Sequence, residues 1–371
     1  MNSSAAKEQR TQSPTSGLIR YLIGFYLVLI AYVSLTPFSG WHVPTGAPWS
    51  FLWQSWPKYI TRFDLAINFL AYLPFGFLLY SYWAARMRDR GAITASILCG
   101  ALLSLTMETL QRFLDDRIAS NVDVLLNCTG CASGALLSAW LAHYTTLDAS
   151  LTRWRRDLLF PGLTVDIGLA LICVWLISQL NPSIPFFGAG VVTEITRSYG
   201  DGYDAPPLSE IPFALGTALN FCGLGLLVTT LMRVRSHALV AVQVLTSIAF
   251  CLKLFAAHAL LRPQVVANWQ SNETLTGLAI GFVVLLPLSL VRLNRRIYLA
   301  AVLILAGGML TKMAGSYTSV REVLRLFDWP YGQLLHFTGL TLYLHEIWPL
   351  VALIFLFWYW WWHRLAGKPA L

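Results

Sequence analysis

Long apolar stretches alternate with short polar segments along almost the whole chain. Each stretch is about 18–25 residues long, which is enough for an α-helix to cross the ~30 Å hydrocarbon core of a bilayer. The predicted helices lie at residues 18–36, 65–85, 92–111, 122–143, 158–180, 211–232, 237–261, 274–291, 297–315 and 338–362. The pattern predicts an all-α integral membrane protein, a polytopic helical bundle of about ten transmembrane helices.

Basic residues are concentrated in alternate connections between the predicted helices. Pairs or triplets of arginine follow the second, fourth, sixth and eighth predicted helices, and most of the 26 lysines and arginines fall on that side. The clusters are Arg86, Arg88 and Arg90; Arg153, Arg155 and Arg156; Arg233 and Arg235; and Arg292, Arg295 and Arg296. Because cytoplasmic connections carry the excess of Lys and Arg, we expect cytoplasmic N- and C-termini and an even number of spans.

Composition narrows the class of protein further. Only 12% of the residues are charged and 56% are hydrophobic, whereas soluble domains carry roughly 25% charged residues. These values exclude a water-soluble enzyme and a disordered chain. The net charge of +8 reflects the cytoplasmic arginines, so no nucleic-acid partner is expected. Residues 1–17 are polar and are predicted to form a disordered cytoplasmic tail.

The six cysteines all fall inside apolar stretches. Cys128 and Cys131 have the spacing of a redox or metal pair. A thiolate inside a bilayer helix is costly, however, and no second Cys or His pair matches these two residues. We interpret them as small packing residues, so the sequence predicts no metal site and no cofactor.

Aromatic residues mark the first predicted outer connection, residues 37–63. Large apolar residues recur there every three or four positions, which would form one face of a helix, and Pro57 is expected to leave only a short helical piece. These residues are Trp49, Trp53, Trp56, Ile60 and Phe63. Because tryptophan prefers the membrane–water boundary, we expect this segment to lie on the outer leaflet.

Polar side chains gather at the predicted outer ends of helices two, three and four. An i, i+4 spacing places Asp64 and Asn68 on one helical face, and Asp123 and Asn127 on another. The third predicted helix and the connection after it add Glu108, Gln111, Arg112 and Arg117. Short connections make these helices probable neighbours, so the sequence predicts that the eight side chains meet at one depth.

Two interpretations account for this costly polar set. In the first, Glu108 or Asp123 pairs with Arg112 or Arg117, and the amides bridge helices. In the second, carboxylates and amides bind the hydroxyl or amino groups of a lipid headgroup, while arginine binds its phosphate or carboxylate. We favour the second interpretation because Arg112 and Arg117 run against the charge bias of the predicted outer side.

Glycine and proline occur within two of the same predicted helices. Pro74 and Gly76 fall in the middle of the second predicted helix and suggest a kink there. Gly130 and Gly134 form the small-x3-small step that allows close helix contact. Packing is the favoured interpretation for both pairs.

Together these motifs resemble the VanZ-like membrane protein family. The resemblance rests on Asn-Phe-Leu-Ala-Tyr-Leu-Pro-Phe-Gly at 68–76, then Glu108-x2-Gln111, then Arg117-x5-Asp123-x3-Asn127-x2-Gly130-x3-Gly134. It covers roughly residues 20–145. It implies a bacterial inner (cytoplasmic) membrane protein associated with low-level resistance to the glycopeptide teicoplanin. The positions that match the family's polar residues are Asp64, Asn68, Glu108, Gln111, Arg117, Asp123 and Asn127.

The second half of the chain carries its own polar groups inside predicted helices. A pair such as Lys253 with Glu346 would neutralise two buried charges. A proton relay through His345 could use the same residues. We favour the structural pair because no tight motif surrounds it.

The sequence divides into a tail at 1–17, a VanZ-like domain at 18–145 and a second helical domain at 146–371. Three functions remain open for this chain. We favour an outer-leaflet site that recognises a membrane lipid or a lipid-linked envelope precursor. A membrane enzyme acting on a lipid phosphate or glycan is the first alternative, with Asp64, Glu108 and Asp123 around a divalent cation and Arg117 on phosphate. A secondary transporter built from two halves of five spans is the second alternative.

Overall fold

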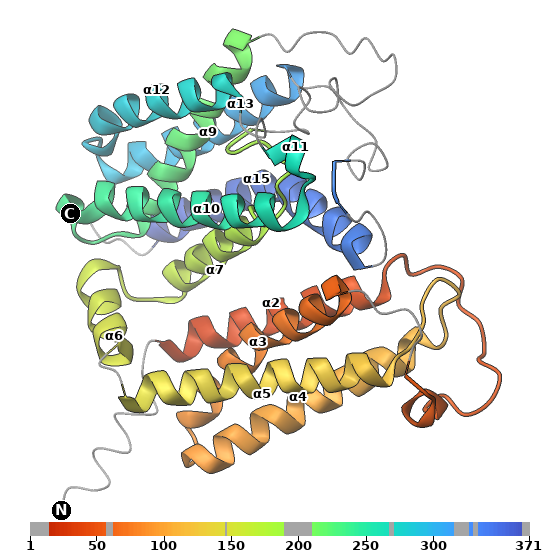
Figure 1. The fold of residues 1–371 in the computed structure, drawn as a ribbon. Helices are drawn as coiled ribbons and strands as arrows, with labels where there is room; N and C mark the ends of the chain where they lie inside the picture. Colours follow the sequence, from red (N-terminus) through yellow and green to blue (C-terminus); the bar gives the residue numbers. More distant parts are fainter. Residues whose placement is uncertain are drawn as a thin grey trace, which may run out of the picture. The chain divides into compact units, whose positions relative to one another are not determined.

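The computed structural model describes residues 15–56, 62–144, 147–188, 210–266, 271–314, 326–328 and 333–365. In these ranges the chain is helical and contains no strand beyond three isolated β-bridges. The chain divides into two compact units, Met1–Arg155 and Arg156–Leu371. Each unit is an assembly of helices (Figure 1).

Four long helices build the first unit, and each is apolar and long enough to span a membrane. They are α2 (Thr15–Leu35), α3 (Arg62–Ala84), α4 (Asp89–Gln111) and α5 (Asn121–Tyr144). All four match predicted spans. The predicted tail lies outside the described residues up to position 14, and α2 already includes residues 15–17.

Close backbone contact between α3 and α5 organises the first unit. A Cβ atom added to Gly134 would lie 1.9 Å from Leu73 O, and one added to Gly130 would lie 2.1 Å from Phe69 O. Gly76 faces α5 in the same way, at 1.9 Å from Cys131 O. Only glycine permits such an approach, so the interpretation of these glycines as packing residues is confirmed. Pro74 lies inside α3, which continues past it to Ala84.

The second unit is built around α9. The long helices are α9 (Glu210–Leu231), α10 (Ala238–Leu260), α12 (Asn272–Ser289), α13 (Leu293–Ala314) and α15 (Gln333–Leu365). Helix α9 packs against α13 and α12, and α15 packs against α13 and the shorter α7 (Leu163–Ser178). Figure 1 shows α9 between its neighbours α12 and α13. A buried apolar core that includes Leu226, Leu227 and Ile304 joins them.

Two elements differ from the predicted pattern. The described residues contain nine helices long enough to span, because the predicted span at 158–180 is reduced to α7, about 24 Å of helix. Pro161 and Gly162 precede α7, and Pro182 follows it, so proline limits the helix at both ends. An additional helix, α6 (Leu147–Leu158), occupies part of a predicted connection.

Residues 179–188 follow α7 as non-helical chain, and almost all of them are buried. Three side chains from neighbouring helices satisfy its carbonyl groups: Lys253 Nζ donates to Asn181 O at 2.8 Å, Asn220 Nδ2 to Phe187 O at 2.9 Å, and His345 Nε2 lies 2.9 Å from Gly188 O. Irregular backbone at membrane depth requires such protein partners. The predicted pair of Lys253 with Glu346 is wrong, since Lys253 is fully buried on this segment and Glu346 is exposed.

Candidate functional site

The predicted polar residues of the first unit lie where α3 and α5 begin and α4 ends. Asp64 is in the first turn of α3, Asp123 is in the first turn of α5, and Glu108 is in the last turn of α4. All three helices contact one another. Two helix N-termini, which favour negative charge, therefore meet the carboxylate-bearing end of a third helix.

Glu108 is fixed against the start of α5. Its side chain is buried, with 4% exposed, and its Oε2 atom accepts a hydrogen bond from Ser120 N at 2.9 Å. Ser120 Oγ in turn accepts from the backbone N–H groups of Val122 at 3.2 Å and Asp123 at 3.4 Å. Ser120 thus caps α5 while its own N–H group orients the carboxylate of Glu108.

The carboxylates of this region lie close to one another. Asp123 is beside Asn68 and within electrostatic range of Asp64, and Glu108 is within electrostatic range of Asp123 and Arg117. Across the described residues, the ion pairs involve other side chains than Glu108 and Asp123. The predicted neutralising pairs with Arg112 or Arg117 are therefore not formed there.

Asn127 Oδ1 is a buried polar atom near these carboxylates without a hydrogen-bond partner among the described residues, whereas the Asn68 side chain bonds that of Asp123 and the Tyr72 hydroxyl bonds Ser104. The amide nitrogen of Asn127 does donate, to Ser104 Oγ at 3.0 Å. Tyr72 lies within electrostatic range of Glu108 and beside Ser104. Buried polar atoms are nearly always satisfied by protein or water, so the side-chain carbonyl of Asn127 can accept a further hydrogen bond.

Tyr72, Ser104 and Ser120 are site residues that the motif search missed. Tyr72 follows Asn68 at i+4, and Ser104 precedes Glu108 at i−4. Extending each motif by one helical turn on the same face would have found both. Ser120 precedes α5 directly, where a serine before an apolar helix is a recognisable cap signal.

Gln111 and Arg117 serve a different purpose from the carboxylates. Gln111 Nε2 donates to Ser34 O at 3.0 Å, and Arg117 donates through Nε to Thr36 O at 3.1 Å and through Nη2 to Val33 O. Both side chains thus bind the unpaired carbonyls at the end of α2. Burial lowers the pKa of Arg117 to about 10, which leaves it protonated at neutral pH.

Arg112 caps the C-terminal end of α4. Its Nε atom is buried and has no hydrogen-bond partner among the described residues. No described hydrogen bond or ion pair joins it to Glu108 or Asp123. Of the eight predicted residues, the structure therefore brings Asp64, Asn68, Glu108, Asp123 and Asn127 together as the carboxylate cluster.

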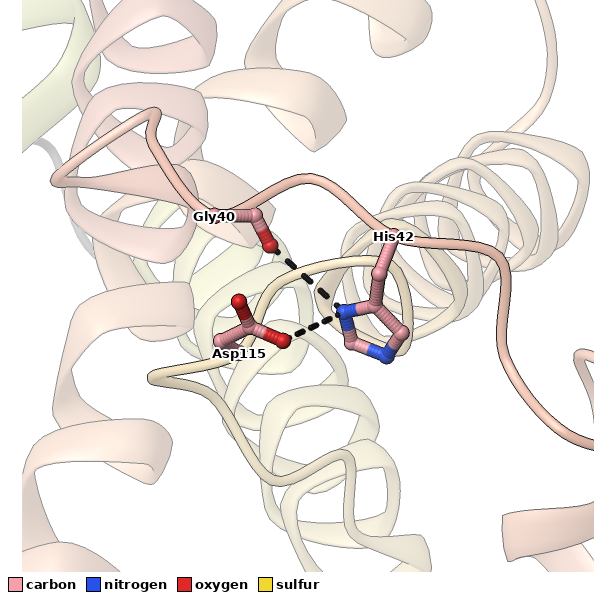
Figure 2. A network of polar contacts seen from close by, with 3 residues as sticks. All are labelled: Gly40, His42 and Asp115. Carbon is pink, nitrogen blue, oxygen red and sulfur yellow. Dashed lines mark hydrogen bonds and ion pairs between the residues drawn. The ribbon is translucent and has the colours of Figure 1, made fainter.

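Hydrogen bonds hold residues 41–56, here called the tryptophan segment, beside this cluster. His42 Nδ1 lies 2.9 Å from Asp115 Oδ1 and 3.5 Å from Gly40 O, the two contacts drawn as dashed lines in Figure 2. Backbone hydrogen bonds reinforce the contact, from His42 N to Phe113 O and from Asp115 N to Gly40 O. At the other end, Asn121 Nδ2 donates to Gln54 O at 2.8 Å. The segment is thus anchored to both sides of the connection between α4 and α5.

The aromatic rings of the tryptophan segment are exposed. Trp41, Trp49, Trp53 and Trp56 all present large apolar area, and Trp53 is 76% exposed. The short predicted helical piece is the 3-10 turn Ser50–Trp53. Ile60 and the side chain of Phe63 lie outside the part of the chain that the structure describes.

The chemistry of the carboxylate cluster is that of hydrogen-bond acceptance. Asp64, Glu108 and Asp123 offer carboxylate oxygens, and Asn127 Oδ1 adds an unpaired carbonyl. These atoms suit ligand hydroxyl or ammonium groups. Within the described residues, no group of three or more His, Cys, Asp or Glu side chains is placed to hold a metal ion.

Comparison with known proteins identifies the first part of the chain. Residues 3–142 match the family model described as VanZ/LLP1. No curated protein and no solved structure matches the chain. The family match covers the four long helices of the first unit, with the carboxylate cluster, and the long apolar helices place the chain in a membrane. The chain is a multi-pass membrane protein whose residues 3–142 resemble the VanZ/LLP1 family.

Proposed function

We propose that the carboxylate cluster recognises the headgroup of a cell-envelope lipid or lipid-linked precursor at the outer leaflet of a bacterial inner membrane. The observation that carries the proposal is the buried, unpartnered carbonyl oxygen of Asn127 near the carboxylates of Glu108 and Asp123. A site that was only structural would satisfy this carbonyl internally, because an unpaired buried group costs about 1–3 kcal/mol.

The charges of the cluster favour particular headgroup chemistry. Arg117 donates to the carbonyls at the end of α2, and no ion pair of the described residues neutralises Glu108 or Asp123. Hydroxyl or amino groups of a sugar or amine headgroup would supply the missing donors to the carboxylates and to Asn127 Oδ1. A bare phosphate would meet repulsion from the same carboxylates.

The tryptophan segment supports a membrane-surface location. Its exposed rings suit the headgroup region of a bilayer, and its anchors at Asp115 and Asn121 keep it beside the cluster. A headgroup bound at Glu108 would thus remain attached to chains embedded in the leaflet below. The positive-inside bias supports an outer location for this end of α3, α4 and α5.

The resemblance to VanZ-like proteins suggests that this recognition contributes to teicoplanin resistance. The test is the teicoplanin susceptibility of cells that express the full chain or Glu108→Gln. We expect wild-type protein to raise the inhibitory concentration and Glu108→Gln to return it to that of cells without the protein. The variant keeps the size of the side chain and removes the charge.

Asp157→Asn is the matched control, because Asp157 is an exposed carboxylate of α6 outside the cluster. It should behave as wild type, and membrane abundance of all variants is measured in parallel. Full resistance with Glu108→Gln at normal abundance would contradict the proposal.

A further inference from the structure

A cavity of about 300 Å³ lies in the second unit, among α9, α13, α15 and the end of the buried segment 179–188. Its volume is at the lower end of the range for ligand sites. Apolar side chains line most of it, including Trp175, Leu224 and Ile304. The carboxylate cluster belongs to the first unit, so this cavity is a separate feature.

The cavity opens between two membrane-spanning helices. Leu305 and Met309 of α13 and Leu350 of α15 line it, and all three are exposed large apolar residues. Exposed apolar side chains of spanning helices face the acyl chains of the bilayer. A lipid chain can therefore reach the cavity sideways from the membrane.

The inner wall of the cavity is polar but already satisfied. Asn220 and His345 line it, and each hydrogen-bonds a carbonyl of the buried segment, at Phe187 and Gly188 respectively. These two side chains therefore need no additional hydrogen-bond partner. The interior suits an apolar occupant.

Two opposite charges also line the cavity. Lys312 is in the last turn of α13 and Glu346 is on α15, and both side chains are exposed. The ion pairs of the described residues do not include either of them. One free ammonium and one free carboxylate beside an apolar cavity match a headgroup that carries one charge of each sign.

We propose that this cavity binds one phospholipid with a zwitterionic, primary-amine headgroup, of the phosphatidylethanolamine class. The acyl chain fills the apolar cavity, the phosphate binds the ammonium of Lys312, and the lipid ammonium donates to the carboxylate of Glu346. A phosphatidylglycerol headgroup leaves Glu346 without a cation. A phosphatidylcholine headgroup brings a cation that lacks N–H donors.

Gly308 provides a direct way to fill the cavity. It lines the space, and a Cβ atom added there meets nothing within 4 Å. Its neighbour Gly307 is unsuitable, because an added Cβ would lie 2.4 Å from Asn220 Oδ1. Gly308→Leu should therefore occupy the cavity without displacing α9. Gly339→Leu is the matched control, since Gly339 of α15 is also open and does not line the cavity.

The experiment is native mass spectrometry of the purified full chain after incubation with equal amounts of phosphatidylethanolamine, phosphatidylglycerol and phosphatidylcholine. Wild type and Gly339→Leu should retain one phosphatidylethanolamine in preference to the other two lipids. Gly308→Leu should lose that lipid. Glu346→Gln should lower the preference over phosphatidylcholine by about tenfold, the effect of one charge-assisted hydrogen bond.

Equal retention by wild type and Gly308→Leu, or no preference among the three lipids in wild type, would overturn the proposal. Because Lys312 and Glu346 are exposed, Lys312→Gln and Glu346→Gln test the headgroup contacts even if Gly308→Leu fails to fold. Glu108→Gln should retain the lipid of this cavity, so failure here is distinguishable from failure of the carboxylate cluster.

Discussion

Glu108 illustrates how a single buried carboxylate is held at the end of a spanning helix. Ser120 N supplies the hydrogen bond that the structure describes for it, and Asp123 lies within electrostatic range. A buried carboxylate needs partners for more than one lone pair. We expect a polar ligand to supply the hydrogen bonds to the Glu108 carboxylate that the neighbouring side chains do not make.

Gly134 makes one of the closest helix contacts in the first unit, which gives a stability prediction. Gly134→Ala places a methyl group 1.9 Å from Leu73 O, so α3 and α5 must separate. We expect a loss of about 1–3 kcal/mol in unfolding free energy, the usual cost of overpacking. Gly24→Ala is the control because an added Cβ there meets nothing within 4 Å. Unfolding in detergent measures both, and equal stabilities would refute the close contact.

Arg117 gives a second prediction at the residue scale. Arg117→Gln removes charged hydrogen bonds to Val33 O and Thr36 O at the end of α2. We expect a loss of about 2 kcal/mol, in the range of hydrogen bonds to charged groups. Asp157→Asn, in the exposed part of α6, should leave the unfolding midpoint unchanged. If Arg117→Gln is as stable as wild type, the guanidinium does not hold α2.

At the scale of elements, helical periodicity predicted every long helix but not the local irregularities. The span at 158–180 was predicted too long because apolar content outweighed Pro161 and Pro182. The buried chain after α7 depends on Lys253, Asn220 and His345, which come from distant helices. No local pattern reveals such contacts.

The contact between the tryptophan segment and the α4–α5 connection can be tested by a disulfide. Trp41 and Leu114 form an antiparallel bridge, so cysteines at these positions lie within bonding range. We expect Trp41→Cys with Leu114→Cys to cross-link under mild oxidation, detected by blocking free thiols and measuring the gel shift. Val43→Cys with Leu114→Cys is the control pair. Cross-linking only in the control pair would contradict the described register.

At the scale of the whole molecule, arginine placement and helix spacing predicted the membrane class and the level at which the polar residues meet. The association of Asp64, Asn68, Glu108 and Asp123 followed from helix direction and i, i+4 spacing. The binding of Arg117 to backbone carbonyls could not be predicted, since carbonyl positions carry no sequence signal.

The two compact units divide the chain between Arg155 and Arg156. Within the described residues the first unit holds four long helices, while the second holds five and α7. The transporter alternative, with two halves of five spans, stays a prediction.

Whether α7 crosses the membrane determines the topology of the second unit. We predict that reporters fused after Arg156 and after Leu371 lie on the same, cytoplasmic side, because α7 and the buried segment 179–188 together complete one crossing. Green fluorescent protein should fluoresce at both positions, and alkaline phosphatase should be inactive at both. Opposite sides for the two positions would show that α7 enters and leaves by one face.

The most direct test of headgroup recognition by the carboxylate cluster is the set of envelope lipids that co-purifies with the full chain. Total envelope lipid extract is the probe, and mass spectrometry compares wild type, Asp123→Asn, Glu108→Gln and the Asp157→Asn control. The account predicts that a hydroxyl- or amine-bearing lipid is retained by wild type and the control but lost from both cluster variants. The same lipids in all four proteins would contradict it.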